Sequence, residues 1–389
     1  MSITARILAF FLALSCLISC GLFPTLAESS EQAPSVSAQS AILIDAINQT
    51  VLYQKNADEI LPMASTTKIM TAMVALTQMP QEACITIDER SVGVEGSSIY
   101  LTAGEELTLE QLLYALLLES ANDAATAIAI GVAGSVEQFA DKMNLAAQEL
   151  GLESTSFQNP HGLDAEGHHT TARELAAITA AALEIPEFRT IVSTRKTTIP
   201  HDGTDGVRLL INHNRLLREY DGTIGVTTGF TKRSGRCLVS AAERNGARLV
   251  AVTLNDPDDW RDHTAMLDYG FSQMETIDLC DAHEICIPVS VVGGTSDAVF
   301  VSNPAALTVS VSKKHSKIIK TIEIPRFLYA SVQSGERVGR VLYQSDLDGD
   351  GTLETIGEAS LIAQSSVDRI KKRKSFFKWL RSLFQRNNK

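Results

Sequence analysis

The order of strand-like and helix-like segments constrains the fold of this chain more than any other feature. Residues 40–45 and 50–54 predict two strands, and residues 235–255 predict a strand pair that turns at Asn245-Gly246. Between them, apolar residues recur at helical spacing in the segments 65–78, 109–130, 136–150 and 172–183. Strands that bracket a helical middle predict an α+β domain over residues 38–275, in which an antiparallel sheet is flanked by helices.

From residue 276 on, the sequence is typical of an all-β domain. Short alternating or β-branched segments separated by turns predict a small sandwich over residues 276–365. These segments are residues 285–292, 299–301, 307–311, 318–324, 337–343 and 354–362. Residues 346–351, Asp-Leu-Asp-Gly-Asp-Gly, match the start of a calcium-binding loop, but its twelfth position would be Gly357, where a bidentate acid is required. We interpret this loop as a hairpin turn, with calcium binding as the alternative.

Residues 1–27 have the features of an export signal. Arg6 supplies the positive start, residues 7–18 are an apolar stretch too short for a comfortable membrane span, and Thr25-Leu26-Ala27 fits a small-residue cleavage site. In the alternative, residues 17–20 are a lipoprotein signal and Cys20 becomes the acylated first residue. Either signal predicts export from the cytoplasm.

Residues 369–389 are a basic segment at the end of an acidic chain. The chain has 34 Lys and Arg against 46 Asp and Glu; nine of the basic residues and none of the acidic ones lie in this segment, which leaves 25 against 46, or −21, for the rest. An acidic body argues against nucleic acid as the main partner. Phe376, Leu380 and Leu383 follow the i, i+4, i+7 spacing of an amphipathic helix. We expect this helix to attach the protein peripherally to the extracytoplasmic face of a membrane, a solvated terminus or a partner-binding helix being the alternatives.

The cysteines outside the signal show no spacing typical of a metal site. Cys237 lies in a predicted buried strand and is expected to be a free core thiol. Cys280 and Cys286 are close enough in sequence to pair in an oxidising compartment. With Cys84 and Cys237 they form a set of four cysteines, which could form two disulfides in three different ways.

A serine and a lysine one helical turn apart are the strongest chemical signal. Ser65 and Lys68 open an apolar helix, and a step of three residues puts both side chains on one helix face. A desolvated lysine has a lowered pKa and can remove the proton of a serine hydroxyl, which makes the serine a nucleophile. Ser-x-x-Lys also occurs at Ser193, Ser310 and Ser375, but none of these opens an apolar helix.

Two further segments complete a known pattern. Ser120-Ala121-Asn122 interrupts an apolar helical region, and Thr227-Thr228-Gly229-Phe230-Thr231 lies on a predicted strand before the hairpin. Together with Ser65 and Lys68, they resemble the S-x-x-K, S-x-N and K-T-G motifs of penicillin-binding proteins and serine β-lactamases. Residues 157–164, 169–172 and 212–217, the β domain and the basic tail are similar to the D-alanyl-D-alanine carboxypeptidases of low molecular mass in peptidase family S11.

The resemblance implies a β-lactamase/transpeptidase-like fold and a role for each matching position. Ser65 would attack the D-Ala-D-Ala carbonyl of a peptidoglycan pentapeptide, Lys68 would be the general base, and Ser120 would relay a proton to the leaving D-alanine. Asn122 and the segment Thr227, Thr228, Gly229 and Phe230 would bind substrate, with the N–H groups of Ser65 and Phe230 as the oxyanion hole. β-Lactams would be inhibitors, and no metal or cofactor is needed.

One position departs from the family pattern. Thr227 stands where the family has a lysine, whose charge attracts the terminal carboxylate of the substrate. Charge-assisted hydrogen bonds are about twice as strong as neutral ones, so we expect weaker substrate and penicillin binding. By approximate spacing, Arg261 would be the carboxylate-binding arginine, with Lys232 or Arg236 as the alternatives.

Two other functions share these motifs. One is a β-lactamase, against which the appended β domain and basic tail argue. The other is a non-catalytic wall protein that lost activity with its lysine, against which the intact Ser65, Lys68, Ser120 and Asn122 argue.

Overall fold

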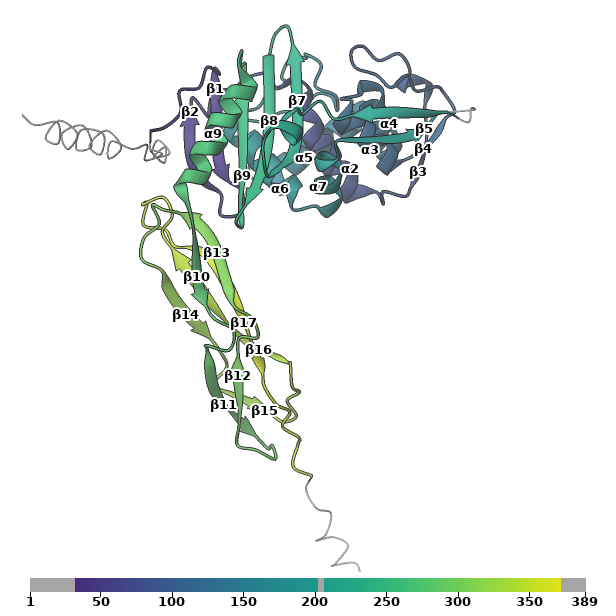
Figure 1. Cartoon of the computed structure of the whole chain (residues 1–389). Helices are drawn as coiled ribbons and strands as arrows, with labels where there is room; N and C mark the ends of the chain where they lie inside the picture. The colour runs from purple at the N-terminus through teal and green to yellow at the C-terminus, as the bar shows by residue number, and fades with distance from the viewer. Residues whose placement is uncertain (1–31, 202–205, 372–389) are drawn as a thin grey trace, which may run out of the picture.

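The computed structural model describes residues 32–201 and 206–371, which form an α+β domain and an elongated β domain that extends away from it (Figure 1). The predicted fold class is confirmed: an antiparallel sheet is flanked by helices, and an all-β region follows. The predicted signal, residues 1–27, and all but the first three residues of the predicted tail helix lie outside the described residues.

The central sheet of the α+β domain has five antiparallel strands. They are β1 (Ser40–Asp45), β2 (Thr50–Lys55), β7 (Thr223–Thr231), β8 (Gly235–Arg244) and β9 (Ala247–Leu254). Their order is β2-β1-β9-β8-β7, and β8 and β9 turn at Asn245-Gly246 as the sequence predicts. The strand β7 therefore lies at an edge of this sheet, and no strand in the described part of the chain pairs with its outer side.

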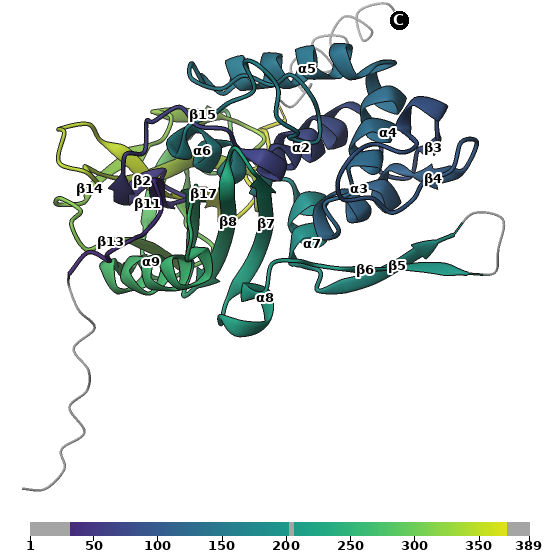
Figure 2. The same ribbon diagram turned by 90° about the horizontal axis from the view of Figure 1, so that it is seen from above.

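The sheet is buried on both faces, which explains why its middle strands are apolar throughout. In β1, Ile42 and Ile44 belong to a core shared with the helical region, whereas Ala41 and Leu43 face helix α9 (Asp259–Gln273). Figure 2 shows α9 on one side of β8 and the helical region on the other. Successive side chains of a strand point to opposite faces, so each strand contributes to both cores.

The helical region lies between β2 and β7 in the sequence. Its helices are the short turns η1 (Ala64–Thr67) and η2 (Glu89–Ser91), and α2 (Lys68–Gln78), α3 (Leu109–Leu118), α4 (Asn122–Ala133), α5 (Val136–Glu149), α6 (Ala172–Leu183), α7 (Pro186–Ser193) and α8 (Leu216–Glu219). The four predicted helical segments are confirmed. The sequence analysis missed the short elements: α7, α8, the pair β3 (Cys84–Thr86) and β4 (Glu106–Thr108), and the hairpin β5 (Lys196–Pro200) and β6 (Val207–Ile211). Short elements carry too few residues for a periodic pattern.

The β domain has its own hydrophobic core. Its strands are β10 (Met274–Cys280), β11 (Cys286–Val292), β12 (Ala298–Ser302), β13 (Leu307–Ser312), β14 (Ile319–Glu323), β15 (Phe327–Tyr329), β16 (Arg337–Ser345) and β17 (Glu354–Ala363). Strands β10 and β13 form one pair, and the others form a sheet in the order β14-β16-β17-β12-β11-β15. The strands β10 and β15 were not predicted.

The cysteines of the described residues are free thiols. Cys280 is buried in the core of the β domain and Cys286 is exposed, so the suggested pairing of these two is not present. Cys237 is a buried core thiol, as predicted. None of the described helices combines the length and the apolar character needed to cross a bilayer.

Candidate active site

Ser65 lies in the turn η1, immediately before helix α2. Lys68 is the first residue of α2; its side chain is fully buried, and its Nζ lies 2.9 Å from the Ser65 Oγ. The helix begins here because Ile69, Met70 and Met73 pack into the core and fix its apolar face. The predicted pairing of the two side chains is therefore present, although Ser65 sits in a tight turn that leads into the helix and not in the helix itself.

Two glycines hold the Ser65 turn from opposite sides. Gly162 has a φ of +87°, and a Cβ on it would lie 1.9 Å from the Ala64 carbonyl oxygen. A Cβ on Gly229 of strand β7 would lie 3.0 Å from the Ser65 backbone nitrogen and 3.2 Å from the Met63 carbonyl oxygen. Only glycine allows the backbone to approach this closely. The third residue of the Thr-Thr-Gly segment therefore positions the Ser65 backbone.

Lys68 is surrounded by hydrogen-bond acceptors. Its Nζ donates to Asn122 Oδ1 over 2.7 Å and to the His161 carbonyl oxygen over 2.8 Å, in addition to the Ser65 contact. Burial lowers the pKa of Lys68 from its ordinary value to about 7, and the carboxylate of Asp123 opposes this change. An amine with a pKa near neutrality can exchange a proton with a serine hydroxyl at 2.9 Å.

The break between α3 and α4 brings Ser120 and Asn122 to the same place. Ser120 has a left-handed backbone, with a φ of 57°, which ends α3 and directs the chain back into α4. Ser120 lines the same pocket as Ser65. Asn122 is 4% exposed: it accepts from Lys68, and its Nδ2 donates to the Glu95 carbonyl oxygen over 2.6 Å. Asn122 therefore holds Lys68 and is not part of the pocket lining, which differs from the expected substrate contact.

A pocket of about 510 Å³ opens between Ser65, Ser120 and the edge strand β7. From β7, Thr228, Gly229 and Phe230 line it. Thr227 is 3% exposed and is not among the lining residues. Because threonine is uncharged, the position that carries lysine in the family pattern contributes no charge here.

The arginine of the pocket is Arg236 and not Arg261. Arg261 is 74% exposed, forms an ion pair with Asp258 at 3.2 Å and lies outside the pocket lining. Arg236 lines the pocket, and its Nε and Nη2 donate to the two carboxylate oxygens of Asp259 over 3.0 and 2.8 Å. Such a pairing leaves Nη1 and one Nη2 hydrogen on the side of the guanidinium away from Asp259. This edge can receive a second carboxylate.

Sequence reasoning missed five lining residues, which are Ser97, His213, Cys237, Asp259 and Trp260. They come from two loops, strand β8 and the start of α9, and no local motif connects them with Ser65. Asp259 is the first residue of α9 and is 5% exposed, but the helix dipole alone favours an acid at a helix start, so nothing in the sequence indicated its pairing with Arg236.

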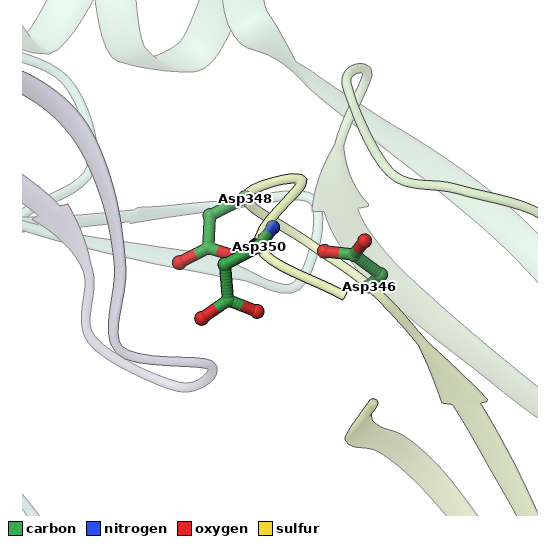
Figure 3. A group of neighbouring side chains, drawn as sticks. All are labelled: Asp346, Asp348 and Asp350. Atoms are coloured by element: carbon green, nitrogen blue, oxygen red, sulfur yellow. Dashed lines mark hydrogen bonds between the residues drawn. The ribbon is translucent and has the colours of Figure 1, made fainter. Parts of the chain in front are cut away.

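The residues that the structure describes also contain one group of side chains able to hold a metal ion, Asp346, Asp348 and Asp350 (Figure 3). One oxygen from each lies within 4.8 Å of the others. The same carboxylates accept backbone N–H groups of their own loop, for example Gly349 N over 2.7 Å and Thr352 N over 2.6 Å. The loop joins β16 to β17 as the predicted hairpin turn, and these hydrogen bonds account for its three acids.

Comparisons with known proteins point to one family. The family model of D-alanyl-D-alanine carboxypeptidase matches residues 27–258. The chain is 33% identical to the D-alanyl-D-alanine carboxypeptidase DacF of Bacillus subtilis over 79% of this chain and 82% of that one. It is 32% identical to DacC of Escherichia coli, over 88% of this chain and 87% of that one.

Two solved structures are similar over different lengths. Penicillin binding protein 5 from Haemophilus influenzae is 27% identical, with a TM-score of 0.62, over 87% of this chain and 99% of that one. The Streptomyces K15 DD-transpeptidase is 35% identical, with a TM-score of 0.59, over 62% of this chain and 99% of that one. The longer match includes much of the β domain as well as the domain that carries the pocket.

Proposed function

The chain belongs to the D-alanyl-D-alanine carboxypeptidases of peptidase family S11, and from this premise we propose that it removes the terminal D-alanine of peptidoglycan stem peptides through an ester on Ser65. The observation that carries the proposal is the contact of 2.9 Å between the buried Lys68 amine and the hydroxyl of Ser65, which lines a pocket bounded by an open strand edge.

Lys68 acts as the general base in this proposal. A neutral amine has two hydrogens and one lone pair, and the side chain has two acceptors, Asn122 Oδ1 and the His161 carbonyl oxygen, besides Ser65. With its hydrogens on these two acceptors, the lone pair points at the Ser65 hydroxyl and accepts its proton. The Ser65 oxygen then forms a bond to the carbonyl carbon between the two D-alanines.

The tetrahedral oxygen is stabilised by backbone N–H groups of Ser65 and Phe230. Removal of one such donor costs roughly 2.7–4 kcal/mol in comparable enzymes. The C–N bond then breaks, and the leaving amine of D-alanine receives the proton of Lys68 through the Ser120 hydroxyl. Water hydrolyses the ester by the reverse proton path, which releases the shortened peptide and restores Ser65.

Arg236 binds the terminal carboxylate in this proposal. Arg236 pairs with Phe230 and lies one strand in from the open edge of β7, but its side chain lines the pocket and can therefore meet the end of a peptide that lies along that edge. Asp259 fixes the guanidinium plane and leaves its outer edge for the substrate. Arginine recognises carboxylates through two parallel N–H bonds, so Arg236 supplies the charge that Thr227 does not.

The protein acts outside the cytoplasm in this proposal, exported by residues 1–27 and held at the membrane surface by residues 369–389. The basic and aromatic character of that tail supports interfacial attachment.

A labelled penicillin and a synthetic pentapeptide test the activity. We expect stable labelling and D-alanine release by the wild type and neither by Ser65→Ala; Ser193→Ala, which alters an exposed Ser-x-x-Lys serine, is the matched control. Rapid turnover of the drug would indicate a β-lactamase. Absence of both labelling and D-alanine release would indicate a non-catalytic protein, and an adduct on another residue would refute the role of Ser65.

A further inference from the structure

One face of the β domain exposes a group of large apolar side chains, which we call the outer aromatic face. It consists of Pro288 and Val292 of β11, Phe300 of β12, and Phe327 and Tyr329 of β15. Val292, Phe300, Phe327 and Tyr329 are 51%, 53%, 47% and 71% exposed, and the rings of Phe327 and Tyr329 meet edge to face at 5.3 Å. Single exposed apolar side chains are common, but a contiguous group of this kind marks an interaction surface.

The strand register shows that these side chains share one face. Pro288 pairs with Phe300, and Val292 pairs with Tyr329. Directly paired residues point to the same side of a sheet. The intervening Val289 and Val291 are buried on the opposite side, in the core of the domain. The outer aromatic face is therefore a second apolar surface of this sheet, additional to the one that the core needs.

The outer aromatic face lies where the chain leaves the β domain. The final described residues run beside the end of β11: Thr295 N donates to the Asp368 carbonyl oxygen over 2.8 Å, and Ile370 N donates to the Gly293 carbonyl oxygen over 3.0 Å. Figure 1 shows β11, β12 and β15 at the end of the β domain farthest from the α+β domain, with the chain departing from that end. The pocket with Ser65 lies in the other domain.

The segment that follows indicates what covers this face. Residues 372–389 contain seven Lys and Arg, no Asp or Glu, and the aromatic residues Phe376, Phe377, Trp379 and Phe384. Basic and aromatic residues together are the composition of a segment that lies in the lipid headgroup region. Because the outer aromatic face lies next to the start of this segment, binding of the segment to lipid brings the face to the same lipid layer.

We infer that the outer aromatic face enters the lipid interface next to the tail, as a second membrane contact built from folded structure. Tyrosine and phenylalanine suit this layer because their rings are apolar and the tyrosine hydroxyl remains hydrated. The exposed charges close by in sequence are Arg326, Arg369 and Lys371 against Glu284, Asp297, Glu323 and Asp368, so the face itself has no positive excess and the attraction to anionic lipid comes from the basic tail. Two weak contacts on one chain bind a membrane more stably than either one does, since the second is intramolecular.

The test compares full-length proteins in binding to vesicles of phosphatidylethanolamine and phosphatidylglycerol. The triple variant Phe300→Thr, Phe327→Thr, Tyr329→Thr keeps strand-forming residues while it removes the aromatic area. We expect it to partition at least about tenfold more weakly than wild type, because apolar surface no longer leaves water. The difference should persist at high salt, where the attraction of the basic tail is screened. A second triple variant, Val207→Thr, Leu209→Thr, Ile211→Thr, removes an exposed apolar row on β6 and should bind like wild type.

A second variant keeps the inference testable if the triple variant misfolds, because it reports lipid contact by a gain of fluorescence signal. Ser290 is exposed between Phe327 and Ala298 on this face, so Ser290→Trp should show blue-shifted emission, quenched by brominated lipid, beyond any change that wild type shows when vesicles are added. D-Alanine release from a soluble peptide should not change in either variant. Equal partitioning of wild type and triple variant at high salt, or an emission shift of Ser290→Trp no larger than that of wild type, overturns the inference. A wild-type dimer that the triple variant abolishes would assign the face to a second copy and also overturn it.

Discussion

Arg236 provides the sharpest prediction, because it tests whether this residue supplies the positive charge for the substrate carboxylate that the family pattern places at position 227. The change Arg236→Gln removes the charge but retains a planar donor group, on a shorter side chain. We expect a much smaller kcat/KM for a peptide that ends in D-Ala-D-Ala with a free carboxylate. A peptide with a C-terminal amide should be cleaved equally by both enzymes, because it offers no charge to lose.

The size of the effect follows from the geometry of the pocket. A hydrogen bond to a charged group contributes about 1.5–3 kcal/mol. Arg236 is 48% exposed, so solvent screening favours the lower half of this range, about 1.5–2 kcal/mol. Since about 1.4 kcal/mol is a factor of ten, the preference for the acid over the amide should fall by roughly 10- to 30-fold.

The assay measures cleavage of both peptides by mass spectrometry in wild type and the variants. Arg261→Gln is the matched control, since it removes an arginine of the same region that lies outside the pocket, and it should behave as wild type. Asp259→Asn should fall between wild type and Arg236→Gln, because the guanidinium is then held less firmly. If Arg236→Gln slows both peptides equally, the residue supports the fold and does not recognise the carboxylate.

Four further predictions concern the turn, the base, the altered motif and a buried histidine. Thr227→Lys should accelerate acylation by penicillin by about tenfold, because the longer side chain can bring a charge to the pocket, which the buried threonine does not line; slower acylation would show that the role inferred for this strand is wrong. Gly229→Ala should slow acylation by about 100-fold, because the new methyl group displaces the Ser65 backbone, and an unchanged rate would contradict the close contact. The acylation rate should rise with pH through about 7, as Lys68 loses its proton, and become constant above it; a flat profile across this pH range would exclude this base. Burial also lowers the pKa of His263 to about 3. Because this pKa lies below that of an unfolded histidine, the unfolded state binds more protons at acidic pH. The contribution of His263 to the unfolding free energy should therefore be fully present above about pH 6.5 and decline by up to about 1.4 kcal/mol per pH unit as the pH falls towards the folded-state pKa of about 3. Urea unfolding of wild type and His263→Gln, at neutral pH and about two units below it, measures how much unfolding free energy each protein loses between the two pH values. An equal loss in both proteins would refute the prediction.

Local sequence was sufficient for the long elements and for the Ser65–Lys68 pair. An apolar residue every third or fourth position specifies a helix, and alternation or β-branching specifies a strand, without reference to distant residues. The pairing of Ser65 with Lys68 is likewise local, because three residues are less than one helical turn. The hairpin at Asn245-Gly246 was predictable because those two residues favour the turn that strands require.

Arg261 shows what sequence spacing could not specify, which is the direction of a side chain relative to the pocket. Helix α9 begins at Asp259, which lines the pocket, and Arg261 lies two positions later, about 200° around the helix axis. Its side chain therefore leaves the pocket for solvent. Arg236 is far from Asp259 in sequence, and only the pairing of β7 with β8 and the packing of α9 on β8 bring the two together.

The amino-acid sequence alone determined the kinds and the order of most long elements, and the nucleophile with its base, because each depends on residues within a few positions of one another. The tertiary structure decided the rest of the site. Complete burial lowers the pKa of Lys68, two glycines from distant segments hold the Ser65 turn, Asn122 supports the lysine, and Arg236 lines the pocket. These properties arise from contacts between segments that are far apart in the chain, and local periodicity carries no information about such contacts.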